Sequence, residues 1–426
     1  MTSNRSRSVA ILADTDSRWK WAAHLAGRLH PSTPVAGFQL LGSVPPSGRQ
    51  LAEAGLQPGQ IRSVTAAELI GALCEQQPDV LILALPGGGC QAMLHLLAAA
   101  ELPSRPLVVA GYVGVVYEKV VEGLLLRAGA DLIVANSPAD YDRFRLVLSG
   151  AGVDPSCLVL GRLPFLGDAR PDRLTASASD VYTVTFAGQP GVPGSLRERR
   201  YLIERLAEHA RRHTARDVQV KLRALPGERV THAELYSYAD LVQGLGASRP
   251  PNLKLAMGEM GEVLDRTDLL VTVSSTAAAE AIHRSVPTAI LTDFGIRESL
   301  GNAYFLGSGC LVSFDDLDAG AAPVAEPRWA RRHGLGIGID QLPGRVAEQL
   351  VRNGLPQLRP FYTLANAPAL LPGLLARYGV RADGQPLSGG AAGPGRLRAA
   401  VRTSARTMYR HGAEVVAPAL RKLAAI

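Results

Sequence analysis

Three consecutive hydroxyl side chains follow an apolar run in the second half of the chain. Residues 269–273 are predicted to form a buried strand, and Ser274, Ser275 and Thr276 come directly after it. Hydroxyls and unpaired backbone N–H groups at the start of a helix form an anion site that suits a phosphate. Glu280 lies about one turn further on. We therefore predict a ligand site here; the alternative is that the hydroxyls only cap the helix and Glu280 is a solvated carboxylate.

Two more strand ends carry residues suited to a phosphorylated ligand. Lys221 and Arg223 end an apolar strand, and two cations at such a place suit a diphosphate or a sugar-acid carboxylate. Gly188 and Gln189 follow the strand expected at 181–187. The glycine would let the backbone approach a ligand, and Gln189 could bind a base or a phosphate. An ordinary turn built by glycine and proline is the alternative.

Two carboxylates follow the first apolar run, 9–13. Asp14 and Asp16 are expected at the carboxyl end of this strand, where a carboxylate could deprotonate an acceptor hydroxyl or bind sugar hydroxyls. In the alternative interpretation, Asp14 or Ser17 simply caps the helix that follows.

His209 and His213 are four residues apart on the helix expected at 195–212, which is the spacing of two metal ligands on one helix face. We identify no carboxylate beside them, and arginines are close in the sequence, so we expect a solvated face. Four cysteines stand apart without a CxxC or CxxH spacing, which disfavours a structural zinc site or a disulfide scaffold and fits a reducing cytoplasm; they are Cys74, Cys90, Cys157 and Cys310.

Short apolar runs alternate with helical patterns, and this sequence of elements occurs twice. Strands without polar alternation, separated by helices, indicate parallel sheets covered on both faces. We therefore predict an α/β protein of two Rossmann-like lobes, with ligands bound between facing strand ends. The strands are expected at 9–13, 35–41, 79–85, 106–110 and 131–135, and again at 181–187, 218–222, 253–255, 269–273 and 288–291.

Composition suggests the boundaries of the domains. We predict an acceptor lobe at 1–165, a Pro/Asp/Ser/Thr-rich linker at 166–180 and a donor lobe at 181–341. Helices that could cross back to the first lobe follow at 342–381, then a Gly/Pro-rich linker at 382–395 and a basic tail at 396–426.

The net charge is concentrated at the C-terminal end. The chain has 426 residues with 45 Lys+Arg and 38 Asp+Glu, a net charge of +7, and six of these charges belong to 396–426. The nearly neutral remainder disfavours a nucleic-acid-binding surface. Four arginines recur every four residues, so we predict a basic amphipathic helix that binds an anionic membrane surface; a solvated helix packed on the body is the alternative. They are Arg398, Arg402, Arg406 and Arg410.

Neither a leader nor a membrane span is expected. Residues 1–8 are polar and lead straight into a strand, and no segment offers about 20 uninterrupted apolar residues. We expect a cytoplasmic protein that is peripheral on the inner face of the plasma membrane.

The hydroxyl segment resembles a known enzyme family. A strand followed by Ser-Ser-Thr-x-x-x-Glu-Ala and a return through Val286-Pro-Thr288 is similar to the donor-binding region of GT-B glycosyltransferases, in particular bacterial capsule and sialyl/Kdo-type polysaccharide transferases. Phe186-Ala-Gly-Gln-Pro190 is similar to the loop that opens their C-terminal lobe. Many retaining members carry a second Glu eight residues before Glu280, where this chain has Thr272. Lys221 stands where these transferases often have Lys-x-His-Pro, but the His-Pro is missing here.

The first lobe resembles a second group of sequences. Asp14-Thr-Asp-Ser-x-x-Lys-Trp21 is similar to the N-terminal signature of an uncharacterised bacterial family described as glycosyltransferases. Gly111-Tyr-Val-Gly114, Arg127 ahead of 131–134, and 163–166 fit that family too. The matches span most of 9–310.

These resemblances imply a glycosyltransferase that takes a nucleotide-sugar as co-substrate and acts on a cell-envelope glycan or lipid-linked acceptor. They imply no cofactor, and no metal, because GT-B enzymes usually need none; the Asp-x-Asp metal motif belongs to the other glycosyltransferase fold. Asp16, or Asp14, would be the base, the hydroxyl cluster would hold phosphate, and Lys221 and Arg223 would neutralise the leaving group. The alternatives are a teichoic-acid-type glycerophospho- or polyol-phosphate transferase and a non-catalytic sugar- or nucleotide-binding protein.

Overall fold

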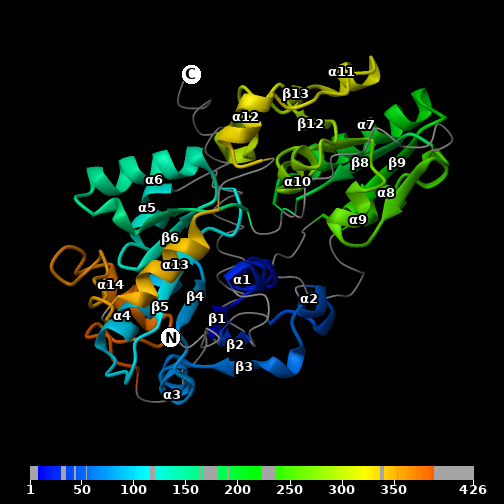
Figure 1. The fold of residues 1–426 in the computed structure, drawn as a ribbon. Helices are drawn as coiled ribbons and strands as arrows, with labels where there is room; N and C mark the ends of the chain where they lie inside the picture. Colours follow the sequence, from blue (N-terminus) through cyan, green and yellow to red (C-terminus); the bar gives the residue numbers. More distant parts are fainter. Residues whose placement is uncertain are drawn as a thin grey trace, which may run out of the picture.

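The chain folds into two α/β lobes, each built on a parallel sheet (Figure 1). Both sheets are parallel in all their paired strands, so the prediction of two Rossmann-like lobes is confirmed. The computed structural model describes residues 8–29, 35–42, 45–53, 55–115, 120–163, 166, 181–189, 191–222, 236–335, 340–352 and 354–387. Most of the two predicted linkers lies outside these residues, namely 167–180 of the linker at 166–180 and 388–395 of the linker at 382–395, as do the tail at 396–426 and Arg223.

The first lobe contains a sheet of the order β3-β2-β1-β4-β5-β6-β7. Its strands β1, β4 and β5 are buried along their whole length, as their apolar sequences predict. The strands are β1 Val9–Ala13, β2 Val35–Leu40, β3 Ile61–Val64, β4 Val80–Ala84, β5 Leu107–Gly111, β6 Leu132–Ala135 and β7 Leu158–Leu160. The helices are α1 Asp16–Leu29, α2 Gly48–Glu53, α3 Ala66–Gln76, α4 Gly87–Ala99, α5 Val120–Leu125 and α6 Pro138–Gly150, with short 3-10 turns η1 Pro58–Gln60 and η2 Pro155–Cys157.

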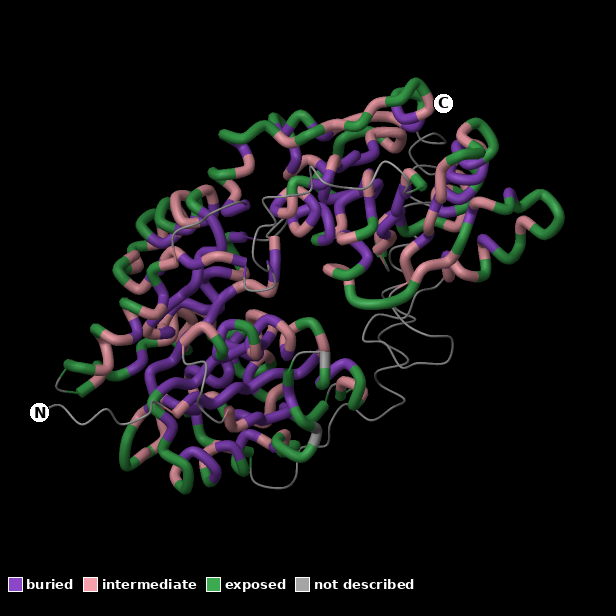
Figure 2. The backbone as a smooth tube through the Cα atoms, turned by 45° about the vertical axis from the view of Figure 1, so that its right-hand side comes forward, coloured by how far each residue is buried: buried purple, intermediate pink, exposed green. Residues whose placement is uncertain are grey.

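The second lobe contains a sheet of the order β10-β9-β8-β11-β12-β13. The strands are β8 Thr183–Ala187, β9 Asp217–Lys221, β10 Leu253–Ala256, β11 Leu269–Thr272, β12 Thr288–Leu291 and β13 Leu311–Val312. The helices are α7 Leu196–Arg212, α8 Tyr238–Gln243, α9 Met260–Leu264, α10 Ala277–His283, α11 Phe314–Asp318 and α12 Pro327–Arg332, with 3-10 turns η4 Gly246–Ser248, η5 Glu298–Leu300 and η6 Asn302–Phe305. Figure 2 shows the buried residues in the interior of both lobes and the exposed ones at the periphery.

After the second lobe the chain returns to the first (Figure 1). Two helices, α13 Leu342–Val351 and α14 Leu371–Ala376, place apolar side chains in the two cores that cover opposite faces of the first sheet. Leu342 and Val346 join one core, and Leu371 and Leu375 join the other. The first lobe is therefore completed by residues that are distant in the sequence.

The strand order defines where ligands can bind. In each sheet the first strand lies in the middle, the next strands are added on one side of it, and the later strands are added on its other side. The direction in which strands are added therefore reverses between β1 and β4 in the first sheet and between β8 and β11 in the second. Ligands of open α/β sheets bind outside the carboxyl ends of the strands at such a reversal, because the loops diverge there and leave a crevice.

The predicted elements differ from the observed ones mainly at edges. The strands β3, β7 and β13 are absent from the prediction; they are short, and β3 and β13 are only partly buried, so their apolar signal is weak. Helix α4 begins at Gly87, with three consecutive glycines in its first turn. Its glycines permit close packing, since a Cβ on Gly87 would lie 2.9 Å from Leu126 and one on Gly89 3.2 Å from the Tyr378 ring.

Candidate active site

A small pocket lies at the strand reversal of the second sheet. It has a volume of about 220 Å³, and its lining comes from the ends of β8 and β11 and from η5: Gln189, Val192, Ser274, Glu298, Ser299, Leu300 and Gly301. Ser274 Oγ donates to the backbone oxygen of Leu300 and lies 3.0 Å from Gln189 Oε1. Parallel strands bring their carboxyl ends to one edge, and two of the predicted donor-binding residues meet here for that reason.

A larger hollow of about 640 Å³ lies elsewhere on the second lobe, lined by residues between Arg211 and Asn252. These residues belong to the end of α7, the turn before β9, η4 and the turn before β10, at the amino ends of the strands. None of the predicted binding residues that the structure describes lines it, so we assign the candidate site to the smaller pocket at the carboxyl ends.

Thr272 builds the turn that carries the other hydroxyls. Its side chain is fully buried; its Oγ1 donates to the Ala187 oxygen at 2.7 Å and accepts from the Ser275 N–H at 3.1 Å. Ser275 Oγ in turn accepts from the Ala277 N–H at 3.3 Å, as the capping alternative predicts. Thr276 is exposed, and a Cβ added to Gly114 in the first lobe would lie 3.5 Å from its Cγ2. A Glu at position 272 would bury a carboxylate in this hydrogen-bonded turn. The packing of the turn therefore explains why this chain has Thr272 where many retaining GT-B enzymes have a Glu.

Glu280 lies on α10 and is influenced by four charged side chains from other parts of the fold. Burial raises the pKa of its carboxyl group to about 7; Arg284 lowers that pKa, Glu259 raises it, and Lys20 and Lys221 lower it. The Lys221 ammonium donates to the Leu222 oxygen at 2.6 Å. Glu280 is thus a partly buried carboxyl rather than the solvated one of the alternative interpretation.

The first lobe faces this cluster through α1. Lys20 Nζ lies 3.5 Å from Glu259 Oε1, which joins α1 to the residue that precedes α9. Asp16, the first residue of α1, is one helical turn before Lys20 and therefore lies on the same helix face. Asp14 is only 5% exposed and pairs with Arg18 at 2.8 Å. The two aspartates thus have different surroundings, and Asp16 is the one on the face turned to the second lobe.

Lys20 and Glu259 are not among the predicted site residues. The sequence could have indicated Lys20, because it is four residues from Asp16 in the same signature. It could not have indicated Glu259, since this residue meets Lys20 only through the packing of one lobe against the other.

Gly188 is closely covered by a tyrosine. A Cβ at this position would lie 2.4 Å from Cε2 of Tyr238. The Tyr238 ring packs edge-on against Phe186, with centroids 5.4 Å apart, and Arg199 lies 4.8 Å above it. The Tyr238 ring leaves no room for a side chain at position 188. This packing explains the glycine without a ligand.

We predict that Gly188→Ala destabilises the second lobe. The added methyl group must displace the Tyr238 ring or the backbone, and such overpacking costs about 1–3 kcal/mol. Chemical denaturation of both proteins measures the loss. A variant as stable as the wild type that binds nucleotide poorly would instead assign Gly188 to the ligand.

The expectation that His209 lies on a solvated helix face is wrong. His209 is 2% exposed, and its Nδ1 lies 2.8 Å from Oδ1 of Asp318. Asp318 ends α11, 109 residues away in the sequence, so no local pattern could show the carboxylate. Within the described residues, the group His209, His213 and Asp318 is the one whose side chains could hold a metal ion. It stands at the far end of α7 from the pocket.

Comparison with known proteins agrees with this architecture. Solved structures with the same fold include a UDP-GlcNAc 2-epimerase from Neisseria meningitidis bound to UDP-GlcNAc (TM-score 0.52, 10% identity, covering 82% of this chain and 100% of that one). They also include the S. aureus MnaA–UDP co-structure (TM-score 0.51, 12% identity, 81% and 95%) and the UDP-GlcNAc 2-epimerase from Methanocaldococcus jannaschii (TM-score 0.52, 12% identity, 80% and 98%). At this identity the likeness shows the fold alone, which is the two-lobed GT-B fold. No curated protein matches the sequence.

Residues 9–349 match the model of the family described as "Putative glycosyltransferase (DUF6716)". The match covers most of the chain, which therefore belongs to this family and is an enzyme of the GT-B fold. In the part of the chain that the structure describes, none of the helices is both long and apolar enough to cross a membrane.

Proposed function

We propose that this enzyme transfers a sugar from a nucleotide-sugar donor to a hydroxyl of a cell-envelope glycan or a lipid-linked acceptor. One observation carries the proposal: Ser274, Gln189 and Glu280 gather at the carboxyl ends of the second sheet, and α1 presents Asp16 from the other lobe. An acceptor on the first lobe would thus meet a donor on the second.

The donor would bind along the β8–β11 reversal. Ser275 and Thr276 would contact phosphate oxygens, and Gln189 and Ser274 would line the pocket for the adjoining part of the nucleotide. With a pKa near 7, the Glu280 carboxyl could accept a hydrogen bond from a ligand hydroxyl or donate one. Lys221, with Arg223 from outside the described residues, would neutralise the leaving diphosphate.

The reaction would be a direct displacement. The proton of the acceptor hydroxyl passes to the Asp16 carboxylate, the acceptor oxygen bonds to the anomeric carbon, and the nucleotide phosphate leaves with the electrons of the broken bond. Thr272 in place of a second Glu favours inversion over retention. The role of Asp16 and a transfer that requires no bound metal are parts of the proposal.

The nature of the sugar is proposed only as a class. The segments similar to capsule-type transferases favour a polysaccharide precursor, while the missing His-Pro after Lys221 disfavours a CMP-sialic acid. A thermal-shift panel of CMP, CDP, UDP, GDP and dTDP tests the donor site. A nucleotide at about 100 times its Kd should stabilise the fold by about 2.7 kcal/mol. No shift with any nucleotide would contradict a nucleotide-dependent enzyme, and turnover of a CDP-alcohol would favour the teichoic-acid-type alternative.

We further propose that residues 396–426 hold the enzyme on the inner face of the plasma membrane. The support is the sequence alone, with arginines repeating every four residues and six net positive charges. Each basic residue near anionic lipid contributes about 1 kcal/mol.

Truncation after Gly390 is therefore expected to abolish co-sedimentation with anionic vesicles while the nucleotide affinity is unchanged. Neutral vesicles are the control, since they should retain neither protein. If the truncated protein still sediments with anionic vesicles, the tail is not the anchor.

A further inference from the structure

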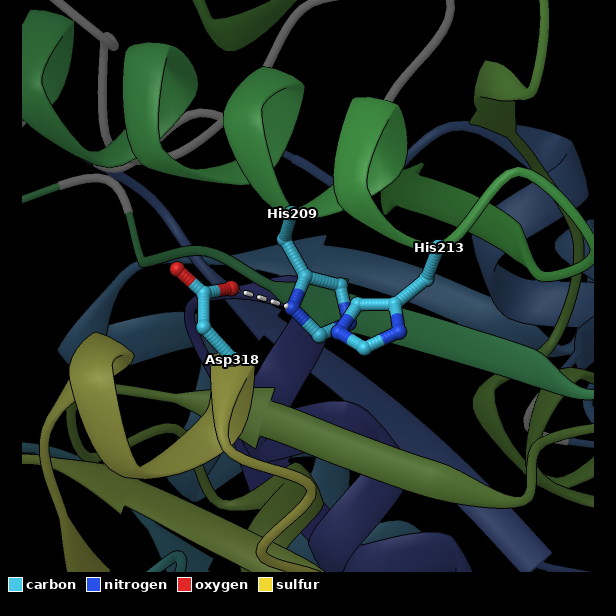
Figure 3. A group of neighbouring side chains, drawn as sticks. All are labelled: His209, His213 and Asp318. Atoms are coloured by element: carbon cyan, nitrogen blue, oxygen red, sulfur yellow. Dashed lines mark hydrogen bonds and ion pairs between the residues drawn. The ribbon is translucent and has the colours of Figure 1, made fainter.

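Two histidines and an aspartate form a cluster at the end of α7 that the proposed transfer does not use. His209 and His213 are one helical turn apart, with ring centroids 4.4 Å apart, and Asp318 reaches His209 from α11 (Figure 3). One possible ligand atom of each side chain lies within 4.8 Å of those of the other two. Because α7 runs back between the parallel strands β8 and β9, its last turn lies at the amino ends of the strands, opposite the pocket.

The hydrogen bonds assign the proton on His209. Arg216 Nη1 lies 3.3 Å from His209 Nε2, and a guanidinium can only donate, so Nε2 carries a lone pair. The ring proton is therefore on Nδ1 and is donated to Asp318. With one proton on Nδ1 and a lone pair on Nε2, the ring is in its neutral form. Neutral imidazole is the form that binds a metal.

His213 supplies the second observation. Its Nε2 is buried and has no hydrogen-bond partner among the described residues, although its ring lies against that of His209. A buried polar atom without a partner is rare in folded proteins and calls for an explanation such as an ion.

We propose that Nε2 of His209 and Nε2 of His213 bind a divalent transition-metal ion of the Zn²⁺ type. Asp318 orients His209 through Nδ1, the arrangement in which a carboxylate fixes the ring of a metal-bound histidine. Water would complete the coordination. The ion would hold the last turn of α7 in place, and the His209–Asp318 contact would link that turn to α11, away from the transfer site.

Binding requires a local rearrangement. Two nitrogens of a tetrahedral zinc site lie about 3.4 Å apart, given Zn–N distances of about 2.0–2.1 Å, whereas the possible ligand atoms of the cluster lie within 4.8 Å of one another. Arg216 must release Nε2 and is the main opposing charge. Two other arginines near the cluster, Arg205 and Arg212, have carboxylate partners besides Asp318, namely Asp315 and Glu208. Arg216 therefore sets the affinity of the site.

Calorimetric titration of the full chain with Zn²⁺ alone tests the proposal, with the visible absorption of bound Co²⁺ as a second readout. We expect one ion per chain. His213→Ala should weaken binding at least tenfold, and Asp318→Asn about 10- to 100-fold. Arg216→Met should strengthen it, a gain that a misfolded variant would not give.

His24→Ala is the matched control, because His24 is exposed on α1 and outside the cluster. It should bind Zn²⁺ as the wild type does. Wild-type protein that binds no Zn²⁺, or a His213→Ala variant with unchanged affinity, would overturn the proposal. None of these outcomes depends on nucleotide binding or sugar transfer.

Discussion

Replacing Asp16 by Asn is expected to lower kcat by about 10²- to 10⁴-fold, the range in which a general base contributes. The amide would keep the size of the side chain on the face of α1 that carries Lys20, but it could not take the acceptor proton. Nucleotide affinity should stay near that of the wild type, because the donor contacts belong to the second lobe. Steady-state kinetics with saturating donor, together with nucleotide titration, separate the two effects.

Asp14→Asn is the comparison variant. Asp14 is buried and paired with Arg18 at 2.8 Å, so its replacement should lower stability more than it lowers kcat of the folded fraction. If Asp14→Asn abolishes turnover in folded protein while Asp16→Asn is as active as the wild type, the base is assigned to the wrong aspartate.

Replacing Glu280 by Gln is expected to stabilise the protein and weaken the donor complex. The pKa of the carboxyl is raised from 4.5 to about 7 in the fold, so the native state favours the protonated form. The contribution of Glu280 to stability is therefore fully present below about pH 4.5 and is lost as the pH rises through about 7. The amide that replaces the carboxyl has no charge to desolvate. The variant should exceed the wild type by about 1–3 kcal/mol at pH 8 and match it near pH 4.

The same substitution should lower nucleotide affinity about tenfold, because a charge-assisted hydrogen bond is replaced by a neutral one. Denaturant unfolding at the two pH values and calorimetric titration measure the two effects. Glu259→Gln serves as the control: Glu259 is exposed and pairs with Lys20, so the stability change should be small at both pH values. A Glu280→Gln variant with no gain at pH 8 would contradict a desolvated carboxyl.

The interior of the fold was predictable because its strands are buried on both faces. Strands such as β4 and β5 consist of apolar residues only, and their signal does not depend on partners. The edge strands β3 and β13 are short and only partly buried, so their positions depend on tertiary pairing.

In the candidate site, too, the sequence indicated the residues that depend on the sheet topology but not their long-range contacts. Ser274 and Gln189 meet because parallel strands end at one edge, a property of the topology that the sequence pattern indicates. The contacts of Gly188 with Tyr238 and of His209 with Asp318 join residues that no periodicity relates. In these cases the residue type was informative, but its partner, and therefore its role, required the packed structure.

Hydrogen exchange with and without the nucleotide that binds most tightly tests the central claim directly, because it locates the bound donor. Protection is expected in the second lobe at 187–189, 272–283 and 298–301, the segments that form the β8–β11 reversal and the adjoining pocket. Exchange around 84–90 in the first lobe should be unchanged. Protection confined to the first lobe, with the second-lobe segments unaffected, would contradict a donor site at this reversal.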